Sequence, residues 1–342
     1  MRVFITGGAG FVGCTLAQNR LDRGDVVTVF DNLSRPRTQH NLEWLQSLAN
    51  SSRLHFVHDD VRNFEGLRDA VAAAQPDLIV HLAAQVAVTT SVRNPREDFE
   101  INALGTFNVL EAARAQSTPP AVFYASTNKV YGGMEDVVIV PGETRYAYQD
   151  FPNGIDENRP LDFHSPYGCS KGAGDQYVRD YARIYGMRTV VFRQSTIYGP
   201  RQFGVEDQGW LAHFIIATIT GKPLTIYGDG KQVRDMLHVR DLISAYDHAW
   251  NSLEVAAGQV FNVGGGMANT ISIWTETGPR LEKLAGRPIP VTYSEWRPGD
   301  QPVFISDNSK AARMLGWSPK VSLDEGVPEI WNWVAQHSDF FR

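Results

Sequence analysis

The chain has almost no cysteine: only Cys14 and Cys169 occur among its 342 residues. Two thiols can build neither a disulfide framework nor a four-ligand zinc site, and both lie in segments expected to be helical, which fits a reducing compartment. No apolar run approaches the roughly 18 residues that a membrane-spanning helix needs. Residues 1–8 have the pattern of a strand that enters a turn, and not the basic and apolar pattern of a signal peptide. We therefore expect the protein to be located in the cytoplasm.

The chain also has no excess of positive charge. Its 32 lysine and arginine residues are outnumbered by 38 aspartate and glutamate residues, giving a formal net charge of −6. Broad binding to a nucleic-acid backbone needs the opposite sign, so we expect no nucleic-acid partner, although a few local arginines could hold a small anionic ligand. His55 and His58 are spaced three residues apart, but no cysteine or acid lies at metal-ligand spacing from them. We therefore expect no metal site.

Apolar runs rich in branched residues alternate with segments of helical spacing from the first residue onward. The predicted strands are Val3–Thr6, Val26–Asp31, Leu54–Val57, Leu78–Leu82, Val122–Ser126 and Thr189–Arg193. The predicted helices include Phe11–Arg23, Phe64–Ala74, Ala103–Ala115 and Pro166–Tyr185. This alternation predicts an α/β fold built on a doubly wound parallel sheet of the Rossmann type.

The sequence pattern changes near Tyr198. After this residue, the predicted elements are short and are separated by proline and glycine. We therefore expect residues 1–198 to form the Rossmann domain, with some later residues, about 225–265, returning to it. Residues 199–342 are expected to form mainly a smaller C-terminal lobe. The long polar segment 132–165 is expected to be functional, because loops of this length inside compact domains usually are, with a tolerated surface insertion as the alternative.

A glycine-rich turn, Thr6–Gly13, follows the first predicted strand and opens the first predicted helix. Gly7 permits the tight turn, Gly10 lets the backbone approach a pyrophosphate, and Gly13 lets helix and strand pack closely. The N-terminus of the helix then offers its N–H groups to the phosphates. Asp31, at the end of the second strand, would accept hydrogen bonds from the adenosine ribose and repel a 2′-phosphate. The pattern predicts an NAD-binding domain.

Two further positions bear on the same cofactor. Arg35 is close enough to Asp31 in sequence to weaken the preference for NAD over NADP. Asp60 and Val61 follow the third strand, where a carboxylate could reach the adenine amino group or could equally cap the next helix.

Tyr167 and Lys171 are spaced to share one face of a helix, one turn apart. A lysine ammonium beside a phenol is expected to lower the pKa of the tyrosine toward working pH, so that it can take a proton from a sugar hydroxyl. Alone, such a pair is more often a solvated helix face. Thr127, however, ends the fifth strand at the edge of the sheet where ligands bind in this architecture, and it could share a proton with Tyr167.

Three motifs occur in a characteristic order: Thr-Gly-x-x-Gly-x-x-Gly, Ser-Thr-x-x-Val-Tyr-Gly and Tyr-x-x-x-Lys. Their combination resembles the extended short-chain dehydrogenase/reductase family of nucleotide-sugar enzymes, over essentially the whole chain. The resemblance implies Thr127, Tyr167 and Lys171 as catalytic. For NAD binding it implies Gly7, Gly10, Phe11, Val12, Asp31, Asn32, Ser34, Arg35, Asp60, Val61, Ala83, Gln85, Asn102, Tyr167, Lys171 and Gln194. For the substrate it implies Thr127, Asn128, Arg201, Arg234, Arg297 and Asp300.

Within that family the segments 31–45 and 152–171 are similar to those of epimerases that invert C2 of a CDP-sugar. The resemblance implies that activity, with UDP-hexose 4-epimerase as the alternative and an inactive NAD-sensing protein as a third hypothesis. Dehydratase relatives carry Asp-Glu directly after the active-site threonine, where this chain has Asn128 and Lys129, so we exclude 4,6-dehydration. The resemblance also implies a homo-oligomer, a dimer or tetramer, built on helices that flank the sheet.

Overall fold

A seven-stranded sheet runs through the part of the chain that carries the glycine-rich turn. A computed structural model describes residues 1–297 and 300–341. The strand order is β12-β8-β5-β4-β1-β2-β3, and β1–β2, β1–β4, β2–β3 and β4–β5 are parallel pairs. The strands are β1 (Arg2–Thr6), β2 (Val26–Asp31), β3 (Leu54–His58), β4 (Leu78–His81), β5 (Ala121–Thr127), β8 (Thr189–Gln194) and β12 (Val260–Val263). This confirms the predicted α/β fold.

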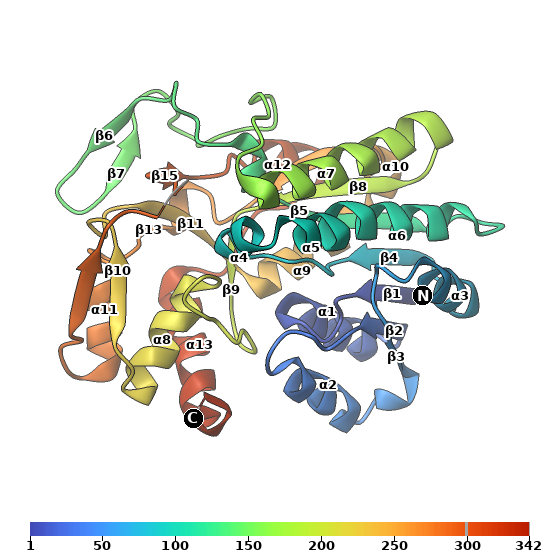
Figure 1. Ribbon diagram of the computed structural model, residues 1–342, viewed down its shortest axis with the longest axis horizontal. Coiled ribbons are helices and arrows are strands. Elements are labelled where there is room, and N and C mark those ends of the chain that lie inside the picture. The colour runs from blue at the N-terminus through green and yellow to red at the C-terminus, as the bar shows by residue number, and fades with distance from the viewer. Residues whose placement is uncertain (298–299, 342) are drawn as a thin grey trace. The chain divides into compact units, whose positions relative to one another are not determined.

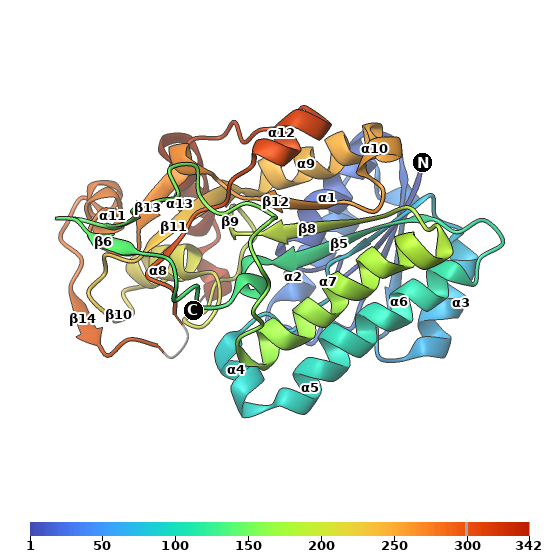
Figure 2. The ribbon, with the colours of Figure 1, turned by 90° about the horizontal axis from the view of Figure 1, so that it is seen from above.

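Helices flank this sheet, with α6 and α7 on one side and α1 and α2 on the other (Figures 1 and 2). The helices are α1 (Phe11–Asp22), α2 (Thr38–Ser47), η1 (Ser51–Arg53), α3 (Phe64–Ala74), α4 (Val88–Arg93), α5 (Pro95–Phe99), η2 (Glu100–Leu104), α6 (Gly105–Arg114), η3 (Asn128–Tyr131), α7 (Ser165–Tyr185), α9 (Val239–Asn251) and α10 (Leu253–Ala256). Helix α3 has the predicted bounds because Asn63 caps it, accepting a hydrogen bond from the Gly66 N–H. The predicted helix 103–115 is shorter, because its first residues belong to the π-helix η2.

The chain divides into two compact units. The first comprises residues 1–130, 165–193 and 243–261, and the second comprises residues 131–164, 194–242 and 262–342. The expected boundary at residue 198 is therefore corrected at two places. Residues 131–164 pack with the second unit, and the segment that returns to the first unit is 243–261 and not 225–265. The reason for the return is visible in α9, where Asp247 forms ion pairs with Arg20 of α1 and with Arg23, which directly follows that helix.

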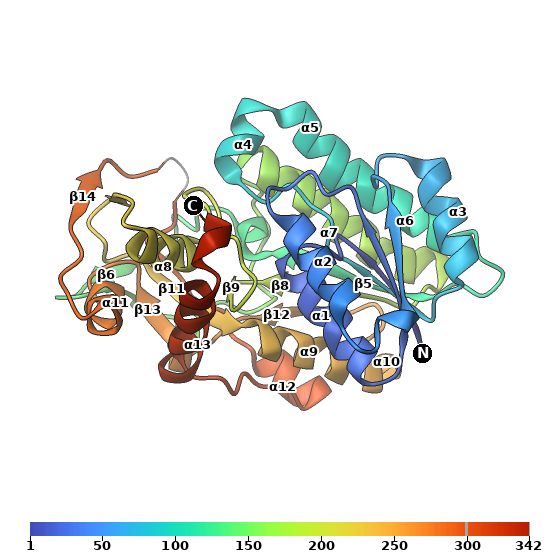
Figure 3. The ribbon, with the colours of Figure 1, turned by 90° about the horizontal axis from the view of Figure 1, so that it is seen from below.

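The second unit combines short strands with helices around its own apolar core. Its strands are β6 (Ile139–Pro141), β7 (Tyr146–Tyr148), β9 (Thr196–Tyr198), β10 (Leu224–Tyr227), β11 (Val233–His238), β13 (Thr270–Ser272), β14 (Val291–Ser294) and β15 (Val303–Phe304). Its helices are α8 (Trp210–Thr220), η4 (Met267–Asn269), α11 (Thr277–Ala285), α12 (Ser309–Leu315), α13 (Leu323–Gln336) and η5 (Ser338–Phe341). Helices α8, α11 and α13 belong to this unit (Figure 3). Their apolar side chains bury one another in its core.

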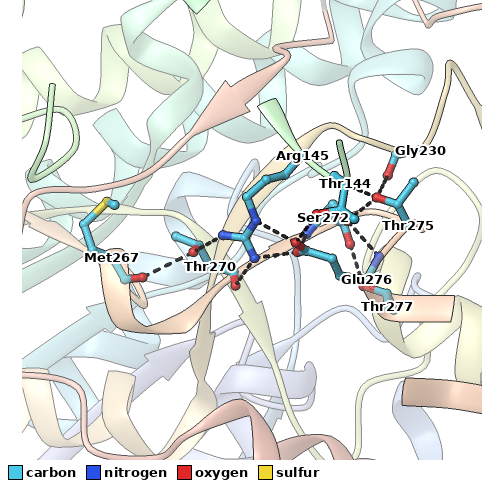
Figure 4. A network of polar contacts seen from close by, with 9 residues as sticks. All are labelled: Thr144, Arg145, Gly230, Met267, Thr270, Ser272, Thr275, Glu276 and Thr277. Atoms are coloured by element: carbon cyan, nitrogen blue, oxygen red, sulfur yellow. Dashed lines mark hydrogen bonds and ion pairs between the residues drawn. The ribbon is translucent and has the colours of Figure 1, made fainter. Parts of the chain in front are cut away.

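The long segment 132–165 contains an antiparallel hairpin, β6–β7, that polar contacts hold to the rest of the second unit. Arg145, in the hairpin, donates to both carboxylate oxygens of Glu276, at 2.7 and 2.5 Å, and to the Thr270 hydroxyl at 2.9 Å. The Thr144 hydroxyl donates to the same carboxylate (Figure 4). The segment is thus ordered by partners that lie far from it in sequence.

Candidate active site

The glycine-rich turn has the geometry that a dinucleotide phosphate requires. Gly7 has a φ of +67°, and a Cβ there would lie 2.7 Å from the Ala83 amide nitrogen. A Cβ at Gly13 would collide with the Gly7 carbonyl. Helix α1 begins after Gly10 without a side-chain cap, so the N–H groups of its first turn are directed at the space where a phosphate would bind. These features fit the pyrophosphate of NAD.

Two side chains hold the turn at Ala9. The Asp31 carboxylate accepts the Ala9 N–H at 3.0 Å and the Leu33 N–H at 2.8 Å, and the Asn41 amide donates to the Ala9 carbonyl at 3.2 Å. Burial raises the pKa of Asp31, and the two N–H groups oppose that effect. Asp31 therefore braces the loop in addition to any contact with a ribose. Asn41 begins one of the segments that carry the family resemblance, but sequence reasoning gave it no role, and its contact with Ala9 was missed.

Asp60 belongs to a polar cluster with Asn32, where the adenosine end of the cofactor is expected. The Asn32 amide donates to the Asp60 carboxylate at 2.7 Å, and Arg62 forms an ion pair with it at 2.8 Å. Although burial opposes it, hydrogen bonding to Arg62 lowers the pKa of Asp60 to about 2. The alternative that Asp60 caps the next helix is wrong, because Asn63 is the cap.

The other residues expected at the cofactor lie nearby in sequence or on the neighbouring strand ends. The Ser34 N–H donates to the Asn32 side chain, and the Val61 carbonyl accepts from the Asn108 amide. The Gln85 N–H donates to the Asn102 side chain at 2.9 Å, and Asn102 donates back to the Gln85 carbonyl at 3.0 Å. Gln194 ends β8 in the second unit.

Thr127, Tyr167 and Lys171 are brought together in the first unit. Thr127 ends β5, while Tyr167 and Lys171 lie in the first turns of α7, and all three side chains are buried. The Thr127 hydroxyl hydrogen-bonds the Tyr167 phenol. The Lys171 Nζ donates to the Ala125 carbonyl at 2.6 Å and lies 4.3 Å from the centroid of the Tyr124 ring. The pair is not a solvated helix face.

The electrostatics of the trio differ from the expectation. Burial raises the pKa of Tyr167 to about 12, against the lowering effect of its hydrogen bond with the Thr127 hydroxyl. Burial lowers the pKa of Lys171 to about 7, against the charges of Asp175 and Asp98. The expected lowering of the tyrosine pKa is therefore not found in the ligand-free protein, where desolvation sets the direction. The Tyr167 phenol therefore needs positive charge from bound ligands if it is to ionise near neutral pH and act as a base.

A buried ion pair supports the catalytic strand and helix. Asp175, one turn beyond Lys171 on α7, pairs with Arg193 of β8 at 2.9 Å and accepts the Ser126 hydroxyl at 2.8 Å. Ser126 directly precedes Thr127, so the pair fixes the end of β5 against α7. Sequence reasoning missed this arrangement, and the one available signal was an acid at helical spacing from Lys171.

The residues expected at the substrate divide between the units. Asn128, in the first unit, accepts from the Thr127 hydroxyl at 3.3 Å. In the second unit Arg234 is buried and forms an ion pair with Asp300 at 2.5 Å. Asp300 is among the residues expected at the substrate, and here its carboxylate is engaged by Arg234. Arg201 has a left-handed backbone with a φ of +68°.

Arg297 lies over the face of Tyr227, with its guanidinium carbon 3.9 Å from the ring centroid. It donates to the Glu206 carbonyl at 3.1 Å, and the Tyr227 hydroxyl donates to the Glu206 carboxylate at 2.7 Å. Pro298 and Gly299, between Arg297 and Asp300, lie outside the described residues. The second unit therefore presents buried and stacked arginines beside an aromatic face.

Two features of the described residues bear on other functions. In residues 1–297 and 300–341, no helix is both long and apolar enough to cross a membrane. The same part of the chain shows no group of three or more histidine, cysteine, aspartate or glutamate side chains that could hold a metal ion. Both cysteines are free thiols, Cys14 buried and Cys169 exposed.

Comparison with known proteins gives matches over nearly the full length. The family model described as GDP-mannose 4,6 dehydratase matches residues 4–330. A CDP-paratose 2-epimerase of Salmonella typhi is 47% identical over 98% of this chain and 99% of its own. A UDP-glucose 4-epimerase of Mycolicibacterium smegmatis is 33% identical over 100% and 99%. The structure of a Thermus thermophilus UDP-glucose 4-epimerase in complex with NAD is similar, with a TM-score of 0.81 and 32% identity, covering 97% of this chain and 98% of that one.

Proposed function

The chain belongs to the GDP-mannose 4,6-dehydratase family of extended short-chain dehydrogenase/reductases, and we propose that it is an NAD-dependent epimerase that inverts C2 of a CDP-sugar. The reaction would be of the CDP-paratose to CDP-tyvelose type and would pass through a transient 2-keto sugar. The observation that carries the proposal is the buried trio of Thr127, Tyr167 and Lys171 in the same unit as the braced glycine turn. The full-length similarity to a CDP-paratose 2-epimerase supports cytidine as the nucleoside of the substrate and C2 as the carbon that is inverted.

The cofactor-binding residues are those of the glycine turn and the adenosine cluster. When bound, NAD supplies a reversible acceptor for a hydride. The N–H groups at the start of α1 would bind its pyrophosphate, and Asp31 retains lone pairs with which to accept ribose hydroxyls while bracing Ala9. The negative charge of Asp31 disfavours the 2′-phosphate of NADP.

The chain's own groups handle the proton. Tyr167 takes the proton of the sugar hydroxyl at C2 and returns it after the sugar has presented its other face. Thr127, hydrogen-bonded to Tyr167, would hold the same hydroxyl oxygen and stabilise the phenolate. Lys171 supplies positive charge along the same helix face. The proton is removed and returned, and the hydride acceptor that bound NAD would supply is reversible, so the sugar would be inverted without net oxidation.

The residues after Thr127 argue against dehydration. Elimination of water needs an acid and a base next to the active-site threonine, and this chain has Asn128 and Lys129 there. Asn128 is instead engaged with the Thr127 hydroxyl. Intact Tyr167 and Lys171 likewise argue against an inactive NAD sensor, which would have no use for a buried lysine.

The second unit would bind the nucleoside diphosphate. Arg234, Arg297 and Arg201 are the cations proposed for the two phosphates, because guanidinium groups bind phosphate in a bidentate manner. Arg234 is held in place by Asp300, and Arg297 by stacking on Tyr227. Substituting Arg234 with methionine should raise KM more than it lowers kcat.

A UDP-hexose 4-epimerase is the second candidate, favoured by the similarity to UDP-glucose 4-epimerases. It would use the same trio with a different sugar pose. The experiment that separates the two is turnover of matched CDP- and UDP-sugars followed by NMR. Inversion of a CDP-sugar at C2 supports the proposal, and inversion of UDP-glucose at C4 alone would overturn it.

We also propose that the protein is a cytoplasmic homo-oligomer. Helices α5, α6 and α7 lie together (Figure 3) and expose apolar side chains, among them Phe99, Phe107, Tyr177 and Ile184, the last of them 65% exposed. A second copy would cover this face. Light scattering should give a multiple of the chain mass, and Ile184→Glu should reduce it. Two free thiols support a reducing compartment.

A further inference from the structure

Asp98 of helix α5 is a buried acid that the mechanism above does not use. It is 1% exposed, and no lysine or arginine nitrogen in residues 1–297 and 300–341 forms an ion pair with it. Its Oδ1 accepts the Gln85 amide at 2.7 Å and the Asn102 amide at 3.1 Å, and its Oδ2 accepts the Ser170 hydroxyl at 2.5 Å. A buried carboxylate is costly unless it is fully hydrogen-bonded or serves a function.

The three donors come from three segments that surround the catalytic turn. Gln85 lies in the loop after β4, Asn102 in the π-helix η2, and Ser170 between Tyr167 and Lys171 on α7. Asn102 also donates to the Ser170 hydroxyl at 3.1 Å. π-helical turns occur frequently at functional sites. Asp98 is thus the common acceptor that joins the cofactor loop to the turn that carries the proposed base.

The charge of Asp98 acts on both proposed catalytic groups. It raises the pKa of Lys171 against the effect of burial, and it raises the pKa of Tyr167 together with burial. The titratable groups that face Lys171 come from several elements: Asp98 on α5, Asp175 and Tyr167 on α7, His81 on β4 and Tyr124 on β5. Asp175 is already neutralised by Arg193, whereas Asp98 has no such partner among the described residues.

We propose that Asp98 is a positioning residue for the reaction: its carboxylate fixes the catalytic turn of α7 through Ser170 and is a buried counter-charge for Lys171. This rests on the proposed function, because it assigns a role toward Tyr167 and Lys171. It differs from a purely structural role in one respect. A structural tie would leave the ionisation of Lys171 unchanged, whereas a counter-charge would not.

The test replaces Asp98 with asparagine, which keeps the volume and removes the charge. The pKa of Lys171 is measured by NMR in the ligand-free protein labelled with ¹³Cε-lysine, with the signal assigned from Lys171→Arg. We expect Asp98→Asn to lower it by about one pH unit. Both limbs of the pH profile of kcat should move to lower pH, because the pKa values of the proposed base and of the lysine both fall.

Three further variants make the result decisive. Ser170→Ala keeps the charge and removes the tie, so it should lower kcat while leaving the Lys171 pKa within about 0.3 unit of wild type. Asp69→Asn, an exposed carboxylate on α3, is the matched control and should change nothing. Asp98→Ser retains a hydroxyl that can accept hydrogen bonds from the neighbouring donors. If the asparagine variant fails to fold, the serine variant must show the same decrease in the pKa of Lys171.

The outcomes separate this inference from the proposed function. An unchanged Lys171 pKa in Asp98→Asn, or in Asp98→Ser, overturns the role of Asp98 whatever the enzyme turns over. A wild-type protein that inverts no nucleotide sugar overturns the proposed function, and the NMR comparison then still decides whether Asp98 sets the charge of Lys171.

Discussion

Replacing Lys171 with methionine should stabilise the ligand-free protein and abolish turnover. The lysine is 4% exposed, and burial lowers its pKa to about 7 from 10.5. Below pH 7 both folded and unfolded chains carry the charge, and the difference between the two pKa values corresponds to about 5 kcal/mol of desolvation cost in the fold. Methionine has a similar length and removes this cost.

The loss of the hydrogen bond to the Ala125 carbonyl offsets part of the gain, by about 1–2 kcal/mol. The variant should therefore be more stable than wild type by about 3 kcal/mol at pH 6. Between pH 7 and 10.5 the unfolded chain binds a proton that the folded chain has lost, so wild-type stability rises by about 1.4 kcal/mol per pH unit. The advantage of the variant should vanish near pH 9.

The assay is thermal unfolding of the NAD-stripped protein at pH 6 and pH 9, with Lys283→Met, at an exposed lysine, as the control. The midpoint of Lys171→Met should lie roughly 4 °C above wild type at pH 6 and close to it at pH 9. The control should follow wild type at both pH values. A variant that is no more stable at pH 6, or equally favoured at both pH values, would refute the reasoning.

Three other substitutions test separate parts of the site. Tyr167→Phe should lower kcat at least about 100-fold with NAD binding retained in calorimetric titration, and near-normal turnover would remove the tyrosine from the mechanism. Asp31→Asn should reduce the ratio of the affinities for NAD and NADP, measured by the same titration. An unchanged ratio would show that Asp31 only holds the glycine turn through Ala9. Arg193→Met should lower the free energy of unfolding in urea by about 3–5 kcal/mol, because it leaves the buried Asp175 carboxylate without its counter-charge. A decrease of less than about 1 kcal/mol would contradict a stabilising ion pair.

The elements of the first unit could be predicted because local signals agree with tertiary packing there. Strand Val26–Asp31 and helix Phe64–Ala74 have the predicted bounds. In the first case branched residues form a run with a polar end, and in the second a capping asparagine precedes an amphipathic segment. The trio was predictable for a different reason: Tyr167 and Lys171 are neighbours on one helix, and Thr127 belongs to a motif that ends a strand.

What the sequence could not reveal depends on contacts between distant residues. The hairpin in segment 132–165 is held by Arg145 and Glu276, whose separation in sequence hides the pairing. Asp98 likewise has its partners on three segments, and no local pattern marks it as buried. The pKa of Tyr167 depends on how completely the fold excludes water, so spacing to a lysine gave the wrong direction.

The measurement that tests the central claim most directly follows the hydrogen at the inverted carbon. CDP-paratose carrying deuterium at C2 is incubated with the protein in ordinary water, and the product is examined by NMR. The proposed mechanism predicts CDP-tyvelose that keeps its deuterium at C2, because the hydrogen would leave and return as a hydride and not as a proton. Solvent hydrogen at C2 of the product, or no inversion of the CDP-sugar at all, would contradict it.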